Sequence, residues 1–228
     1  MNILVINGSP KGEKSNSMKL TRAFLNGAGW TNVETVDVSK SDIKGCLGCY
    51  TCWTKTPGKC VINDSMRDIL KKFIFADIII LSFGLYGCHV PGNLKNLMDR
   101  QIPLMYPEMK EDGHESGEHP TRIDLSKKRH IIISTCGFWT DKGNYDALTW
   151  ILNRGFGENQ YETIFCGQGE LFSIPELNER TNRYLEIVRN AGIEYSKNGV
   201  ISEKIKEELS ETLFPKDEFE KMANGSWE

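Results

Sequence analysis

Short apolar runs alternate with segments of helical periodicity along residues 2–196, and this alternation constrains the fold most. The apolar runs have the length of buried strands and lie at 2–6, 32–38, 76–83, 130–135 and 160–165. Helical segments follow at 16–28, 64–75, 91–100, 145–155 and 175–196, with Asn63 or Asp64 as the cap of the second. Strands that each lead into a helix predict an α/β protein, with a doubly wound parallel sheet covered on both faces.

Ligands of such sheets bind beyond the carboxyl ends of the strands, where the strand order reverses. For the five-strand order 2-1-3-4-5, that point lies between the first and third strands. The loops after strands one, three and four are therefore the first candidates for a binding site.

The rest of the chain sets limits on domains and location. We expect one domain over residues 1–198 and a helical, charged extension over 199–228, with a polar insert at 105–125 as a lid or subunit contact. The net charge of −3 and the lack of a basic block argue against nucleic-acid binding. No apolar run is long enough to span a membrane, and the N-terminus does not resemble a secretory signal. We therefore expect a cytoplasmic protein without disulfides.

The first loop, NGSPKGEKSNS at residues 7–17, joins a buried strand to a helix. It combines hydroxyl and amide donors with the free N–H groups of a helix N-terminus, which suits a phosphate. The donors are Ser9, Ser15, Asn16 and Ser17, and Lys11 or Lys14 can add charge. The loop matches neither the Walker nor the dinucleotide fingerprint, so a mononucleotide is favoured. The alternative is a polar turn with an ordinary helix cap.

The second and third loops have glycines after buried strands. Gly84 and Gly87 let backbone approach a flat ligand, and Tyr86 can stack on it or cover it. Residues 134–139, STCGFW, form a similar turn. Each loop alone is compatible with an ordinary turn, but all three are expected at the same end of one sheet.

The stretches GSPKGEKSNS, LYGCHVPGNLKNLMDR and TCG together resemble the flavodoxin-like NADPH-dependent FMN reductases over about residues 1–195. The resemblance implies that one group of residues holds the FMN phosphate: Ser9, Lys11, Ser15, Asn16 and Ser17. It implies that a second group lines the isoalloxazine: Leu85, Tyr86, Gly87, Cys88, Thr135, Cys136 and Gly137. Many relatives have a proline where this chain has Gly84.

The resemblance also implies an FMN-dependent oxidoreductase that takes electrons from NAD(P)H and reduces a small acceptor such as a quinone or a flavin. The flavin supplies the redox chemistry in such proteins, so no side chain is assigned as a catalytic acid or base. Relatives are commonly dimers or tetramers, which implies a homo-oligomer. Cys88 and Cys136 are interpreted as small thiols near the flavin.

The stretch CLGCYTCWTKTPGKC contains Cys46, Cys49, Cys52 and Cys60 with the spacing C-x2-C-x2-C-x7-C. Four thiolates with a tight C-x2-C-x2-C core are typical of a [4Fe–4S] cluster. Four-cysteine zinc sites usually combine two separate C-x2-C pairs, so zinc is less favoured. The other alternative is no metal, with the cysteines packed as small apolar residues. The pattern resembles the iron–sulfur flavoproteins.

Two alternative functions follow from the cysteine loop. With a cluster, the protein is an electron carrier linked to a ferredoxin, because a cluster passes electrons one at a time. In the second alternative, the protein is a non-enzymatic flavin-binding redox sensor whose cysteine loop regulates assembly.

Overall fold

The computed structural model describes residues 1–109, 117, 119–125 and 127–226, and within them five strands form one sheet. The strands are β1 (Ile3–Asn7), β2 (Val33–Asp37), β3 (Ile78–Gly84), β4 (Arg129–Thr135) and β5 (Tyr161–Cys166). All pairings are parallel and the order is β2-β1-β3-β4-β5, which confirms the predicted fold class. Strand order reverses between β1 and β3.

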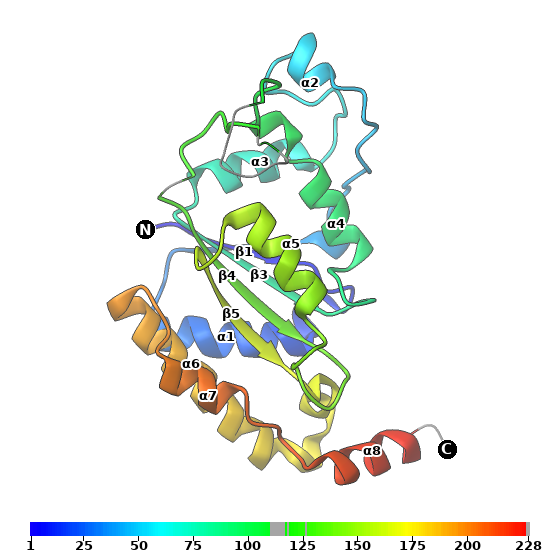
Figure 1. The fold of residues 1–228 in the computed structure, drawn as a ribbon, viewed down its shortest axis with the longest axis vertical. Helices are drawn as coiled ribbons and strands as arrows, with labels where there is room; N and C mark the ends of the chain where they lie inside the picture. Colours follow the sequence, from blue (N-terminus) through cyan, green and yellow to red (C-terminus); the bar gives the residue numbers. More distant parts are fainter. Residues whose placement is uncertain (110–116, 118, 126, 227–228) are drawn as a thin grey trace.

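Helices cover both faces of the sheet (Figure 1). One face carries α1 (Asn16–Ala28), α6 (Asn178–Asn198) and α7 (Glu203–Leu209). The other carries α3 (Met66–Phe75), α4 (Gly92–Asp99) and α5 (Asp146–Phe156). The short helix α2 (Thr51–Thr54) and the C-terminal α8 (Lys216–Gly225) lie at opposite ends of the molecule (Figure 1).

The central strand β3 shows why its sequence is almost wholly apolar. Ile78 and Ile80 pack in the core beneath α1 and α6, whereas Ile79 and Leu81 pack in the core beneath α3 and α4. Successive side chains of a strand point to opposite faces, so a strand covered on both faces needs apolar residues throughout.

The C-terminal extension contributes to this core. Ile201, Leu209, Leu213 and Phe219 are buried in the same cluster as the β-strand residues under α1 and α6. Within the extension, α7 packs against α6 and β5, and α8 lies at the end of the molecule (Figure 1).

Three local features differ from expectation or are only partly described. The helix predicted to be capped by Asn63 or Asp64 begins at Met66, and the Asp64 Oδ1 accepts the N–H of Met66 at 3.1 Å while the same carboxylate also pairs with Arg100. Residues 175–177 form a 3-10 turn ahead of α6. In the insert at 105–125, residues 110–116 and 118 lie outside the described residues.

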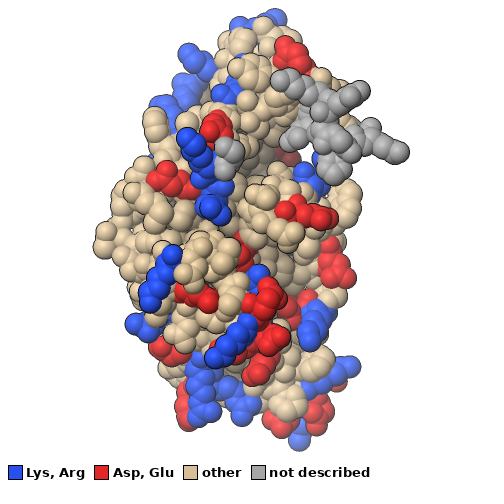
Figure 2. All heavy atoms as spheres, turned by 60° about the vertical axis from the view of Figure 1, so that its left-hand side comes forward, with Lys and Arg blue, Asp and Glu red and all other residues tan. Residues whose placement is uncertain are grey.

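Two observations bear on the class of partner. No helix in the described ranges is both long and apolar enough to cross a lipid bilayer. On the face in Figure 2, basic side chains predominate at the upper left, and acidic and basic side chains alternate over the lower half.

Candidate functional site

A cavity lies at the carboxyl ends of the central strands. It is lined by Ser9, Lys11, Ser15, Asn16, Ser17, Gly84, Leu85, Tyr86, Thr135, Cys136, Gly137 and Glu170. The three predicted loops therefore meet around one space. Of the residues predicted to hold a flavin, all except Gly87 and Cys88 contribute to the lining.

One end of the cavity is made of small hydroxyl side chains at the start of α1. The Ser15 Oγ accepts the N–H of Met18 at 3.3 Å as the N-cap, and the Ser15 and Ser17 hydroxyl oxygens are 3.3 Å apart. Ser9, Ser15 and Ser17 are buried, although they line the cavity. The first N–H groups of a helix have no partner within it, so this end presents several donors and a partial positive charge.

Glu170 is the lining residue that the sequence analysis missed. It follows β5, and its carboxylate forms an ion pair with Lys11, with 3.2 Å between Nζ and Oε2. Only the loops after strands one, three and four were considered, yet β5 ends at the same edge of the sheet. The pair sets one positive and one negative charge at the polar end of the cavity.

The second loop turns back on itself at residues 86–89. Tyr86 and His89 exchange two backbone hydrogen bonds of 2.9 Å, and both central residues have positive φ, +53° for Gly87 and +60° for Cys88. Such a two-residue turn favours glycine, and a cysteine there is uncommon. The turn leaves Gly87 and Cys88 at its tip, outside the lining, and keeps the half-exposed Tyr86 ring at the rim.

The third loop is held rigidly against its neighbours. The Thr135 carbonyl accepts the N–H of Leu85 at 2.8 Å, which ties the second and third loops together. Cys136 is buried, and that burial raises the pKa of its thiol. Its burial makes Cys136 part of the packed wall of the cavity.

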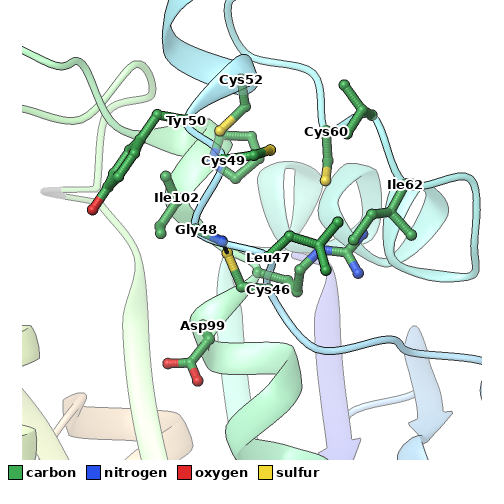
Figure 3. Close-up of a pocket in the computed structure, with 13 residues that line it drawn as sticks. Cys46, Leu47, Gly48, Cys49, Tyr50, Cys52, Cys60, Ile62, Asp99 and Ile102 are labelled. Carbon is green, nitrogen blue, oxygen red and sulfur yellow. Dashed lines mark hydrogen bonds between the residues drawn. The ribbon is translucent and has the colours of Figure 1, made fainter.

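A second cavity lies in the cysteine loop, near α2. Cys46, Cys49, Cys52 and Cys60 all line it, and in Figure 3 Cys49 points toward Cys60. Gly48 and Tyr50 adopt positive φ, +61° and +50°, which coils the backbone tightly between the first cysteines. Within the described ranges, no three His, Cys, Asp or Glu side chains are spaced to hold a metal ion as they stand. The thiols thus share one cavity without converging on a single point.

The thiols are close enough to affect one another. Burial raises the pKa of Cys52, and so do the charges of Cys60, Cys46 and Cys49. Hydrogen bonds from Thr51 lower the pKa of Cys49. Thiolates held this close repel one another, and a bound cation would relieve that repulsion.

Arg100, which lines the cysteine cavity, is one partner of a buried ion pair. Arg100 Nη1 lies 2.8 Å from Asp64 Oδ2 and Nη2 lies 3.0 Å from Oδ1, and the two side chains are 1% and 0% exposed. Burial acts to lower the pKa of Arg100, but the hydrogen bond with Asp64 and the charge of Cys60 raise it. Arg100 therefore stays cationic beside Cys60.

Comparisons with known proteins agree with this architecture. The sequence model of the NADPH-dependent FMN reductase family matches residues 1–114. An iron–sulfur flavoprotein of Methanocaldococcus jannaschii is 42% identical over 106 residues, which are 46% of this chain and 53% of that protein. One from Methanosarcina thermophila is 35% identical over 106 residues, 46% of this chain and 54% of that protein. The chain spans about half the length of the curated relatives it matches.

Solved structures share the fold. The NAD(P)H:quinone oxidoreductase from Methanothermobacter marburgensis has a TM-score of 0.62 at 19% identity, covering 85% of this chain and 95% of that one. An FMN-dependent NADH-azoreductase from Bacillus anthracis has a TM-score of 0.58 at 20% identity, covering 83% and 98%. Sheet order and strand-end cavity define a flavodoxin-like α/β protein. With the family match, the chain belongs to the NADPH-dependent FMN reductase family.

Proposed function

We propose that this chain binds FMN in the strand-end cavity and is an FMN-dependent oxidoreductase that takes electrons from NAD(P)H and reduces a small acceptor such as a quinone or a flavin. The observation that carries the proposal is the meeting of the three predicted loops around one cavity, with hydroxyl donors at one end. The residues fit FMN chemically, because buried hydroxyls and the N-terminus of α1 offer donors for a phosphate.

The chain's own residues would bind and orient the flavin. Ser9, Ser15 and Ser17 would donate to the phosphate, and Lys11 would offset its charge. Leu85, Tyr86 and the adjoining turn at residues 135–137 would line the isoalloxazine. FMN, when bound, supplies the redox chemistry, since its isoalloxazine accepts a hydride or single electrons. Tyr86, at the rim, would control access to the flavin. No side chain is assigned as an acid or base, because the flavin supplies the redox chemistry.

The test of this function is anaerobic reduction of the FMN-loaded protein with NADPH and, separately, NADH. The proposal predicts that at least one nucleotide bleaches the flavin absorbance and that added quinone restores it. No bleaching by either nucleotide, with bleaching by a reduced ferredoxin, would favour the electron-carrier function instead. Bleaching by none of the three would leave a binding protein without reductase activity.

We further propose that Cys46, Cys49, Cys52 and Cys60 hold a [4Fe–4S] cluster. The support is the donor set: four cysteines with the sequence spacing C-x2-C-x2-C-x7-C, all lining one cavity that the buried cation of Arg100 also lines. A cluster, when bound, passes electrons one at a time. This favours electron transfer with a ferredoxin-type partner as the second candidate function.

We also propose a cytoplasmic location. All seven cysteines are free thiols, and a reducing compartment such as the cytoplasm keeps thiols in that state.

Iron and sulfide analysis after anaerobic purification tests the cluster. We expect iron and acid-labile sulfide in equal amounts in the wild type and their loss in Cys52→Ser and Cys60→Ser, with FMN binding retained. Cys88→Ser is the matched control, because Cys88 is an exposed thiol outside both cavities. Wild-type protein with flavin but no iron would contradict the cluster.

We also propose that the protein is a homo-oligomer. Light scattering of the same preparations should give the mass of a dimer or a tetramer.

A further inference from the structure

The buried arginine beneath the cysteine loop has one N–H group without an acceptor. Arg100 Nη1 donates to the Lys44 carbonyl at 2.7 Å and to Asp64, and Nη2 donates to Asp64. Its Nε has no hydrogen-bond partner among the described residues, although the side chain is 1% exposed. A buried cationic donor without an acceptor is costly, so this group is suited to an acceptor that protein atoms do not provide.

The same arginine joins the two ends of the cysteine loop. Lys44 precedes Cys46 and Asp64 follows Cys60, and the Asp64 carboxylate also accepts the backbone N–H of Lys44 at 3.0 Å. Arg100 bonds to both of these residues and lines the cavity that the four cysteines line. These bonds hold the guanidinium between the two ends of the cysteine loop, at a cavity wall where it can meet a bound centre.

We propose that Arg100 is a positioning residue of the cysteine site, whose Nε–H donates to a cysteine sulfur or inorganic sulfide of the bound cluster and thereby raises the cluster's electron affinity. The inference rests on the cluster proposed above. Hydrogen bonds to the sulfurs and net charge are the levers by which a protein sets such a potential. The cation stabilises the more negative, reduced form, and Asp64 moderates this effect from the far side of the guanidinium.

The two partners of the ion pair should shift the potential in opposite directions. Redox titration followed by electron paramagnetic resonance should give a lower midpoint for Arg100→Gln and a higher one for Asp64→Asn. We expect at least a tenfold change in the electron-uptake equilibrium for Arg100→Gln, which corresponds to about 59 mV for one electron. Arg22→Gln, at the exposed pair of Arg22 with Glu13, is the control and should shift nothing.

A purely structural role predicts another pattern. Both ion-pair variants would then lose cluster content while the remaining clusters kept the wild-type potential, and this result would overturn the inference.

A measurement on the wild type keeps the inference testable if the variants do not fold. Protein containing 15N-arginine should show a 15N coupling in the pulsed resonance spectrum of its reduced cluster, and its absence would overturn the inference. Wild-type protein without iron would overturn this inference together with the cluster. A cluster with neither coupling nor shift would overturn the role of Arg100 alone.

Discussion

The Asp64 carboxylate faces the Arg100 guanidinium in a two-bond ion pair, at 2.8 and 3.0 Å, with both side chains shielded from water. Removing one partner of such a pair leaves an uncompensated buried charge. We therefore expect Asp64→Ala to lower the free energy of unfolding by about 3–5 kcal/mol in urea denaturation. Asp68→Ala, which breaks the exposed pair with Lys71, should hardly change the free energy of unfolding. Equal losses would contradict a special role for the buried pair.

Asp64 also gives stability a defined dependence on pH. Burial acts to raise its pKa, but hydrogen bonds from Arg100 and Lys44 lower it below the ordinary 3.8. A carboxyl with a lowered folded-state pKa stabilises fully above its unfolded pKa, and this stability is lost as pH falls through the folded pKa. As the pH is lowered below about 4, the urea midpoint of the wild type should therefore decrease more steeply than that of Asp64→Asn. Parallel profiles would contradict this assignment.

Ser17→Ala tests the phosphate end of the strand-end cavity. A hydrogen bond to a charged group contributes about 1.5–3 kcal/mol, so FMN affinity should fall tenfold or more in a fluorescence titration. The melting temperature should hardly change, since Ser15 rather than Ser17 caps α1. Ser196→Ala, at an exposed serine on α6, is the control. An unchanged affinity would exclude Ser17 from the phosphate site.

Glu170→Gln should have the opposite effect on FMN binding. The Glu170 carboxylate neutralises Lys11 and would repel a phosphate in the same cavity. Both groups are more than half exposed, so the gain should be modest, about two- to fivefold at low salt, and should shrink as salt is added. Weaker binding by this variant would show that Glu170 contributes to the flavin site.

Two glycines allow α1 and α6 to approach closely. A Cβ at Gly192 would lie 2.1 Å from the Phe24 carbonyl oxygen, and one at Gly27 would lie 1.9 Å from that of Arg189. Gly192→Ala should therefore lower the free energy of unfolding by about 1–3 kcal/mol in denaturant titration. In α5, a Cβ at Gly155 meets nothing within 4 Å, so Gly155→Ala should be neutral or slightly stabilising. Equal effects of the two changes would contradict the close approach.

The fold was predictable because the signals that determine it are local. The run at 76–83 lies within two residues of β3, and parallel strands bring their carboxyl ends to one edge. The lining of the strand-end cavity was predictable where loop chemistry is local, as at Ser15 and Ser17. Glu170 and Arg100 were not, because their roles depend on partners at Lys11 and Asp64 that are far away in sequence. Asp64 was predicted only as a helix cap; its carboxylate does accept the N–H of Met66 at 3.1 Å, but its pairing with the distant Arg100 could not be seen.

The strand-end cavity as an FMN phosphate site is the central claim, and one binding comparison tests it most directly. Apoprotein is titrated anaerobically with FMN and with riboflavin, which has the same ring but no phosphate. The account predicts saturation at one FMN per chain and at least tenfold weaker binding of riboflavin, because riboflavin has no phosphate to accept hydrogen bonds from the hydroxyl groups and the N-terminus of α1. Riboflavin binding as tightly as FMN, or no saturable binding of FMN, would contradict it.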